Sequence, residues 1–211
     1  MLKYKLTNWQ WKTHKDTKWG EGVTHETNGE GDLCSEGWLH YYHHPVLAVL
    51  FNPIHAQIRE PILWECEAEG KHKDDMGLKG GCTKLTTIKQ IPLPKITQKQ
   101  KLEIALQCSL QAYRWNCCND LREWEQWVEK YLATKTTTSK DVQKIFKRNF
   151  EDKLLSSGLN LYVFVSARCV TYAMMSTSIN CKVARSIVYS KRAYKDLDII
   201  GIINQVLTPE V

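Results

Sequence analysis

The stretch CSEGWLHYYHHPVLAVLFNPIHA, residues 34–56, decides how the first part of the chain folds. Gly37 allows backbone angles that are closed to other residues and predicts a tight turn, and the aromatic residues 38–42 favour a strand. Pro45 suits the first position of a helix, because its ring fixes the backbone dihedral there. The run PVLAVLF is apolar on every side, so we expect it to be buried and to end at the Asn-Pro pair of residues 52–53.

Upstream of this stretch, residues 2–6 (LKYKL) alternate between apolar and charged side chains. This period of two predicts a half-buried strand, with Tyr4 and the two leucines on one face and Lys3 and Lys5 on the other.

Downstream, residues 62–70 (ILWECEAEG) alternate in the same way and predict a second half-buried strand. One face holds Ile62, Trp64, Cys66 and Ala68, and the other holds Glu65, Glu67 and Glu69. Residues 71–81 are rich in Lys, His and Gly and predict a loop, whereas the β-branched content of residues 83–91 favours another strand. The two prolines of IPLPK, residues 91–95, then break the strand pattern.

From Thr97 onward the apolar residues recur with the period of a helix. Thr97 followed by Gln100 is a capping-box signature, and we expect residues 158–194 to be helical as well. The predicted fold class is therefore α+β. It consists of a mainly antiparallel β-rich domain in residues 1–94 and a C-terminal helical, basic domain in residues 95–211.

Charge is divided unevenly between these halves. Residues 1–94 carry 11 Lys/Arg and 12 Asp/Glu, a net of −1, whereas residues 95–211 carry 18 and 11, a net of +7. An anionic partner should therefore be sought on the second half.

The eight cysteines are scattered, with no C-x-x-C pair. We expect them to be reduced and mostly buried. Cys34, His40, His43 and His44 all carry atoms that suit zinc, but their spacing matches no standard zinc pattern, so we predict no metal site and take the histidines as surface or helix-capping residues.

Three further patterns leave alternatives open. The glutamates of residues 65–69 can serve acid-base chemistry or form the solvated outer face of a sheet. Basic side chains form stripes at helical spacing that can bind phosphates or acidic protein surfaces, or can simply be solvated. These candidate partner-binding residues are Lys140, Lys144, Lys147 and Arg148 in one stripe, and Lys182, Arg185 and Arg192 in another.

Residues 19–56, LWECEAEG and GGCTKLTTIKQIPLP together resemble an uncharacterised domain family common in bacteriophage and prophage genomes. The resemblance covers about residues 1–110. The positions that carry it are Cys34, Gly37, Trp38, His40, Pro45, Gly70, Cys82, Leu85 and Thr86. It implies a phage-encoded accessory protein in a bacterial host cytoplasm.

With no nucleotide-binding loop or hydrolase motif in the chain, binding explains the pattern better than catalysis does. We expect the protein to bind a host protein or nucleoprotein complex with an acidic or phosphate-bearing surface. It would act as an anti-defence inhibitor of the anti-CRISPR type or as a binder of nucleic-acid machinery. We expect no cofactor and no membrane partner, since no apolar run approaches a membrane span and MLKYKLTNWQWK lacks a signal-peptide core.

Two alternatives remain. The order of strand, Gly-aromatic turn, short helix and strand is similar to the start of ADP-ribosyltransferase-like domains, which use NAD. That similarity implies catalytic roles for His40, Tyr42 and Glu67. The second alternative is a structural virion protein.

Overall fold

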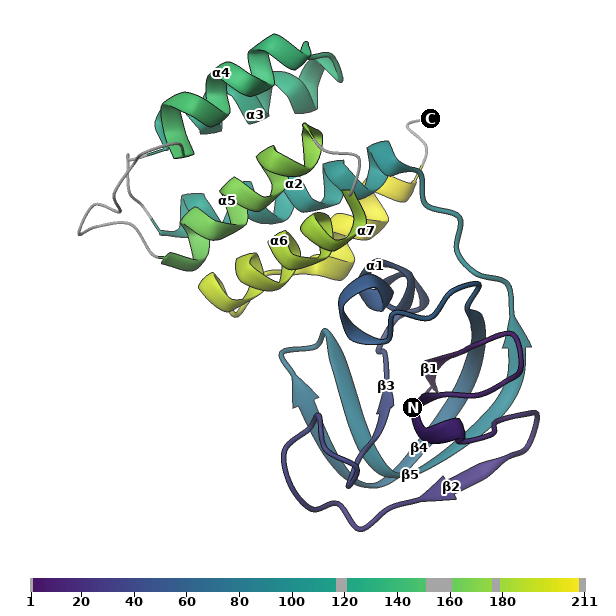
Figure 1. The fold of residues 1–211 in the computed structure, drawn as a ribbon. Coiled ribbons are helices and arrows are strands. Elements are labelled where there is room, and N and C mark those ends of the chain that lie inside the picture. Colours follow the sequence, from purple (N-terminus) through teal and green to yellow (C-terminus); the bar gives the residue numbers. More distant parts are fainter. Residues whose placement is uncertain (1, 117–120, 151–160, 176–178, 209–211) are drawn as a thin grey trace. The chain divides into compact units, whose positions relative to one another are not determined.

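A computed structural model describes residues 2–116, 121–150, 161–175 and 179–208 of the chain (Figure 1). The chain divides into two compact units, Met1–Lys95 and Ile96–Val211. The first contains an antiparallel sheet and the second contains a set of helices. The α+β fold class predicted from the sequence is therefore confirmed.

The first unit is built on a five-stranded sheet. Its strands are β1 (Leu2–Thr7), β2 (Thr24–Glu26), β3 (Leu39–Tyr41), β4 (Ile62–Asp75) and β5 (Lys79–Ile91). They follow the order β1-β4-β5-β2, and β3 also pairs with β5, all antiparallel. The long β4–β5 hairpin curves strongly and carries the other strands (Figure 1).

One backbone bridge closes these strands into a ring. The amide of Tyr4 in β1 donates to the carbonyl of Tyr42, just after β3, at 3.0 Å, and the amide of Tyr42 donates back at 2.7 Å. The ring therefore runs β1-β4-β5-β3 and returns to β1. Closure pairs edges that would otherwise be exposed, and it gives the sheet an interior.

That interior contains the two lysines of β1, which corrects the half-buried strand expected there. Lys3 and Lys5 are each only 7% exposed, and Leu6 on the opposite face is also buried. The alternation was right, but the lysine face is the more deeply buried one, because ring closure encloses it, whereas Leu2 on the other face is 44% exposed. The hydrophobic cluster of this unit consists of Trp19, Tyr41, Trp64, Cys66, Cys82 and Leu85, with Leu39, Ile62 and Ala68 packed against them.

The loop predicted for residues 71–81 is wrong, since β4 continues to Asp75 and β5 begins at Lys79. The turn between them is short, and Asp74 Oδ2 accepts a hydrogen bond from the amide of Gly77 at 2.7 Å. Gly80 does not mark a loop either. A Cβ atom there would lie 2.5 Å from the Tyr41 ring, so the glycine makes room for an interior aromatic side chain.

Helix α1 (Pro45–His55) begins where the sequence predicts it, with Pro45 as its first residue. The His44 side chain caps it by accepting a hydrogen bond from the amide of Val46 at 3.2 Å. The predicted end at residues 52–53 is wrong, because the helix passes through Pro53 to His55. Pro53 lies in the last turn, where its missing amide removes a single helical bond, and the buried apolar face holds the helix in place.

Gly37 is needed for space. A Cβ atom at Gly37 would lie 2.1 Å from the carbonyl oxygen of Glu30, and that backbone cannot move aside as a flexible side chain can. The predicted turn residue is thus a point where two backbone segments cross closely. A short 3₁₀ helix, η1 (His14–Asp16), lies earlier in this unit.

The described part of the second unit is helical. Its helices are α2 (Gln98–Trp115), α3 (Arg122–Thr134), α4 (Ser139–Phe150), α5 (Leu161–Met174), α6 (Ile179–Ala193) and α7 (Ile199–Leu207). The predicted capping box is confirmed, because Thr97 and Gln100 each accept a hydrogen bond from the other's backbone amide. α5 and α6 confirm the helical prediction for the described part of residues 158–194.

A buried cluster of serines joins three of these helices. Ser109 of α2 lies 2.6 Å from Ser166 of α5 and 2.8 Å from Ser186 of α6, measured between hydroxyl oxygens. Ser190 of α6 lies 2.7 Å from Ser166. The small side chains let the helices approach closely, and the hydroxyls satisfy one another.

Within the described ranges, no helix combines the length and the apolar character that crossing a membrane requires.

Candidate functional site

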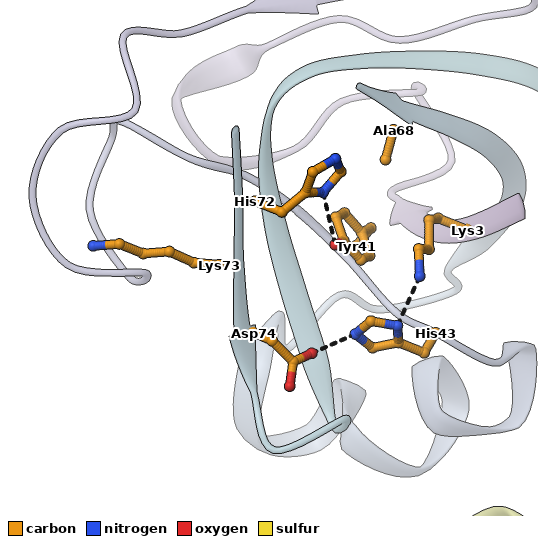
Figure 2. A pocket seen from close by; sticks show the side chains of 7 residues that line it. All are labelled: Lys3, Tyr41, His43, Ala68, His72, Lys73 and Asp74. Atoms are coloured by element: carbon orange, nitrogen blue, oxygen red, sulfur yellow. Dashed lines mark hydrogen bonds and ion pairs between the residues drawn. The ribbon is translucent and has the colours of Figure 1, made fainter. Parts of the chain in front are cut away.

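A pocket of about 420 Å³ opens in the first unit, at the end of the ring where β1, β3 and β4 come together (Figure 2). Its lining consists of Lys3, Tyr41, His43, Ala68, His72, Lys73 and Asp74. Lys3 comes from β1, Tyr41 from β3, and the others from β4, except His43, which follows β3. Residues far apart in the sequence are thus gathered by strand pairing.

Three of these side chains form a continuous hydrogen-bonded chain. Asp74 Oδ1 lies 2.6 Å from His43 Nε2, and His43 Nδ1 lies 2.8 Å from the Lys3 amine (Figure 2). A carboxylate can only accept, so His43 presents its Nε2–H to Asp74 and leaves Nδ1 as an acceptor for Lys3. The aspartate therefore fixes both the tautomer and the orientation of the imidazole.

Burial shapes the protonation of this chain. Desolvation lowers the pKa of Lys3, and the negative charge of Asp74 opposes that shift. Desolvation and the nearby Lys3 amine also lower the pKa of His43, again opposed by Asp74. The imidazole is consequently neutral at pH 7, and its Nδ1 accepts a hydrogen bond from the Lys3 amine.

A second polar pair faces the same pocket. The Tyr41 hydroxyl lies 3.2 Å from His72 Nδ1. Desolvation raises the pKa of Tyr41 to about 12, so its phenol stays protonated and remains a hydrogen-bond donor. The Lys3 amine lies 5.1 Å from the centre of the Tyr41 ring, so the two polar groups share one space.

Lys5 lies deeper in the ring, two residues along β1. Its amine donates to the carbonyl of His40 at 3.0 Å and lies 4.3 Å from the centre of the Trp19 ring. Burial lowers the pKa of Lys5 to about 8, although Cys66 and Cys82 oppose that shift. The same burial raises the pKa of the Cys66 thiol to about 12 and that of Cys82 to about 11, so both are inert as nucleophiles.

The three residues assigned to NAD chemistry do not line this pocket. His40 is half-buried, its ring hydrogen-bonded to the carbonyl of Leu33. Tyr42 is buried and stacks on His55, with ring centres 6.0 Å apart. Glu67 is exposed on β4, next to residues that face the interior. Within the described part of the chain, these three side chains make no hydrogen bond or ring contact with one another.

The cysteine and histidines considered for zinc are also dispersed. Cys34 is exposed and its sulfur lies 3.1 Å from the Lys79 amine, while His43 belongs to the hydrogen-bonded chain. His44 caps α1, as expected for a helix-capping histidine. Across the described residues, no group of three or more His, Cys, Asp or Glu side chains is arranged to hold a metal ion.

The described cysteines are free thiols. Cys66, Cys82 and Cys108 are buried, Cys169 and Cys181 are half-buried, and Cys34 is exposed. The expectation of reduced, mostly buried cysteines thus holds for three of these six, and Cys117 and Cys118 lie outside the described residues.

On the second unit, the predicted stripe of α4 is exposed. Lys140, Lys144 and Lys147 point to solvent, but Arg148 forms an ion pair with Glu123 of α3 at 2.6 Å. Arg148 is therefore partly neutralised within the protein.

The predicted residues Lys182 and Arg185 of α6 belong to a group of cations that also includes Arg168 of α5, which the sequence did not predict. Burial raises the pKa of the Cys169 thiol, and the positive charges of Arg185, Arg168 and Lys182 act on it in the opposite direction. Those three cations therefore lie close enough to Cys169 for their charges to act on its thiol. The Lys182 amine also lies 3.9 Å from the centre of the Tyr172 ring, which is 47% exposed.

Arg192 is exposed two turns along α6 from Arg185. Arg168 was missed because it stands alone in the apolar segment YVFVSARCV. Only the pairing of α5 with α6 adds it to the group.

Residues 1–99 match a protein family described as a domain of unknown function, DUF7666. No curated protein and no solved structure matches the chain.

Proposed function

We propose that the protein is a phage-encoded accessory protein that binds a host protein or nucleoprotein complex through the basic surface of its helical unit. In this role it acts as an anti-defence inhibitor of the anti-CRISPR type, or as a binder of nucleic-acid machinery. The phage setting is supported by the sequence pattern of about residues 1–110. The mode of action is supported by the second unit.

The observation that carries the proposal is the group of cations around Cys169. Arg168, Lys182 and Arg185 act on a single thiol, and Tyr172 exposes an aromatic ring beside Lys182. Clustered cations attract phosphates or acidic side chains, and an exposed aromatic ring adds a stacking surface. The second unit as a whole is also basic, because residues 96–211 carry 17 Lys/Arg and 11 Asp/Glu, a net of +6.

The test is affinity capture from a bacterial host lysate by the full chain and by the double variant Arg168→Glu/Arg185→Glu. The negative charges that the two glutamates introduce should repel the anionic partner, so we expect capture at low salt to fall at least about tenfold. Treating the lysate with nuclease distinguishes the two kinds of partner. Loss of capture by the wild type after this treatment indicates a nucleic acid, and retained capture indicates an acidic protein surface.

The matched control is Lys140→Glu/Lys144→Glu, which makes the same change of charge on the exposed stripe of α4. If this control loses capture and the α5–α6 variant does not, the binding surface is the α4 stripe. Equal capture by all three proteins would refute binding through the basic surface.

A further inference from the structure

The pocket of the first unit provides what a nucleophilic lysine requires. Such a lysine needs an uncharged amine, a neighbouring base that accepts its proton, a group that orients the base, and space for a reactant. Lys3, His43 and Asp74 stand in those relations at 2.8 Å and 2.6 Å, beside about 420 Å³ of open space. This follows the logic of a catalytic triad, with an amine in place of the hydroxyl.

We propose that Lys3 is a nucleophilic amine that forms an imine with a small aldehyde or ketone bound in this pocket. Lys3 reacts as the uncharged amine, with one of its N–H groups hydrogen-bonded to His43 Nδ1. The nitrogen lone pair attacks the carbonyl carbon, and His43 Nδ1 takes one proton from the amine nitrogen and returns it to the former carbonyl oxygen, which gives a carbinolamine. The carboxylate of Asp74 stabilises the transient imidazolium. The carbinolamine hydroxyl then leaves as water together with the second amine hydrogen, and the C=N bond forms.

The pair formed by Tyr41 and His72 can interact with the carbonyl oxygen of the reactant. Tyr41 keeps its phenolic proton, and its hydroxyl lies 3.2 Å from His72. The hydroxyl shares the pocket with the Lys3 amine. When His72 Nδ1 donates to the Tyr41 oxygen, the phenolic hydrogen is left to donate to the carbonyl oxygen of a reactant.

The charges in the pocket favour an uncharged carbonyl group over a phosphate. Lys73 points away from the pocket centre, and its amine donates to the carbonyl of Gly31 at 2.6 Å (Figure 2). That leaves Lys3 as the lysine directed inward among the lining residues, opposed by the carboxylate of Asp74. A multiply charged anion would need more cations than the lining offers.

The experiment is reductive trapping on the full chain. Acetaldehyde and pyruvate, each with sodium cyanoborohydride, convert an imine into a stable secondary amine that peptide mass mapping assigns to one lysine. Mapping also separates Lys3 from the α-amino group. We expect Lys3 to be labelled about tenfold faster than exposed Lys18 of the same unit, since a positioned base accelerates amine attack.

Asp74→Asn tests the positioning role of the aspartate. The amide oxygen can still accept the hydrogen bond of the Gly77 amide, so the hairpin turn is kept, while the amide nitrogen faces His43 and imposes the wrong tautomer. We expect labelling of Lys3 to slow at least about tenfold. The control Asp75→Asn removes the same charge one residue away and should label Lys3 at the wild-type rate.

Two results would overturn the proposal. One is labelling of Lys3 no faster than that of Lys18 with both carbonyl compounds. The other is equal labelling of Lys3 in Asp74→Asn and Asp75→Asn, with both variants folded by circular dichroism.

Discussion

Lys5 places an amine inside a ring of strands whose other interior residues are mostly apolar. Its hydrogen bond to the His40 carbonyl and its position over the Trp19 ring replace only part of the water that the charge loses. The folded protein therefore holds the Lys5 proton less tightly than the unfolded chain, with a pKa of about 8 against an ordinary 10.5. Between these values the unfolded state binds more protons, so the contribution of Lys5 to the free energy of unfolding rises with pH.

We expect replacement of Lys5 by Met to reveal the free-energy cost of burying the charged amine. The stability of Lys5→Met relative to wild type should be greatest below pH 8 and should fall by up to about 3 kcal/mol by pH 10.5. The raised thiol pKa values of Cys66 and Cys82 destabilise both proteins above pH 9 and largely cancel in the difference. Urea unfolding at several pH values measures this difference in the free energy of unfolding, and Lys18→Met is the surface control. A difference that does not change with pH would contradict the lowered pKa of Lys5.

The pocket shows why single residues were hard to assign from sequence. The LKYKL alternation puts Lys3 and Lys5 on one face, but nothing local shows that the Tyr4–Tyr42 bridge encloses that face. Lys3 and His43 are 40 positions apart, and His43 and Asp74 are 31 apart. Their meeting depends on strand register and on a hairpin predicted as a loop.

At the scale of elements, local signals were reliable where they act locally. Pro45 starts α1 and Thr97 with Gln100 caps α2, because each motif satisfies backbone groups within a few residues. Residues 71–81 misled because polar residues and glycines are typical of loops. In the structure the same residues form the end of the β4–β5 hairpin, where Gly80 makes room for the Tyr41 ring of β3.

The serine cluster of the helical unit makes a prediction for its packing. Ser166 contacts the hydroxyls of Ser109, Ser186 and Ser190, so Ser166→Ala leaves buried hydroxyls with fewer partners. We expect a loss of about 1–3 kcal/mol in the free energy of unfolding, measured by circular dichroism during urea denaturation. Ser139→Ala, at an exposed position in α4, is the control and should change stability by less than about 0.5 kcal/mol. A smaller loss for Ser166→Ala than for the control would show that the cluster is not stabilising.

At the scale of the whole molecule, the change of period at residues 91–95 was the most informative sequence feature. Period two before it and period 3.6 after it separate a sheet from helices, and the fold class follows directly. The closure of the ring of strands and the packing of α5 against α6 could not be predicted from the sequence, since both depend on contacts between distant segments. For the same reason, only part of each candidate site was found.

The division of charge between the units leads to a last prediction. Lys95 is exposed, and the residues around it, 92–97, are in neither helix nor strand, so a lysine-specific protease should cut after Lys95 early in a limited digest. The resulting fragment 1–95 has 12 Lys/Arg and 12 Asp/Glu and is neutral, whereas 96–211 has 17 and 11 and a net charge of +6. If each unit keeps its own core, the fragments should separate on a cation exchanger at pH 7 and low salt. The first should then flow through, and the second should be retained until salt screens its basic surface. Mass spectrometry identifies the fragments, and co-elution of both in the salt step would show that they stay bound to each other after cleavage.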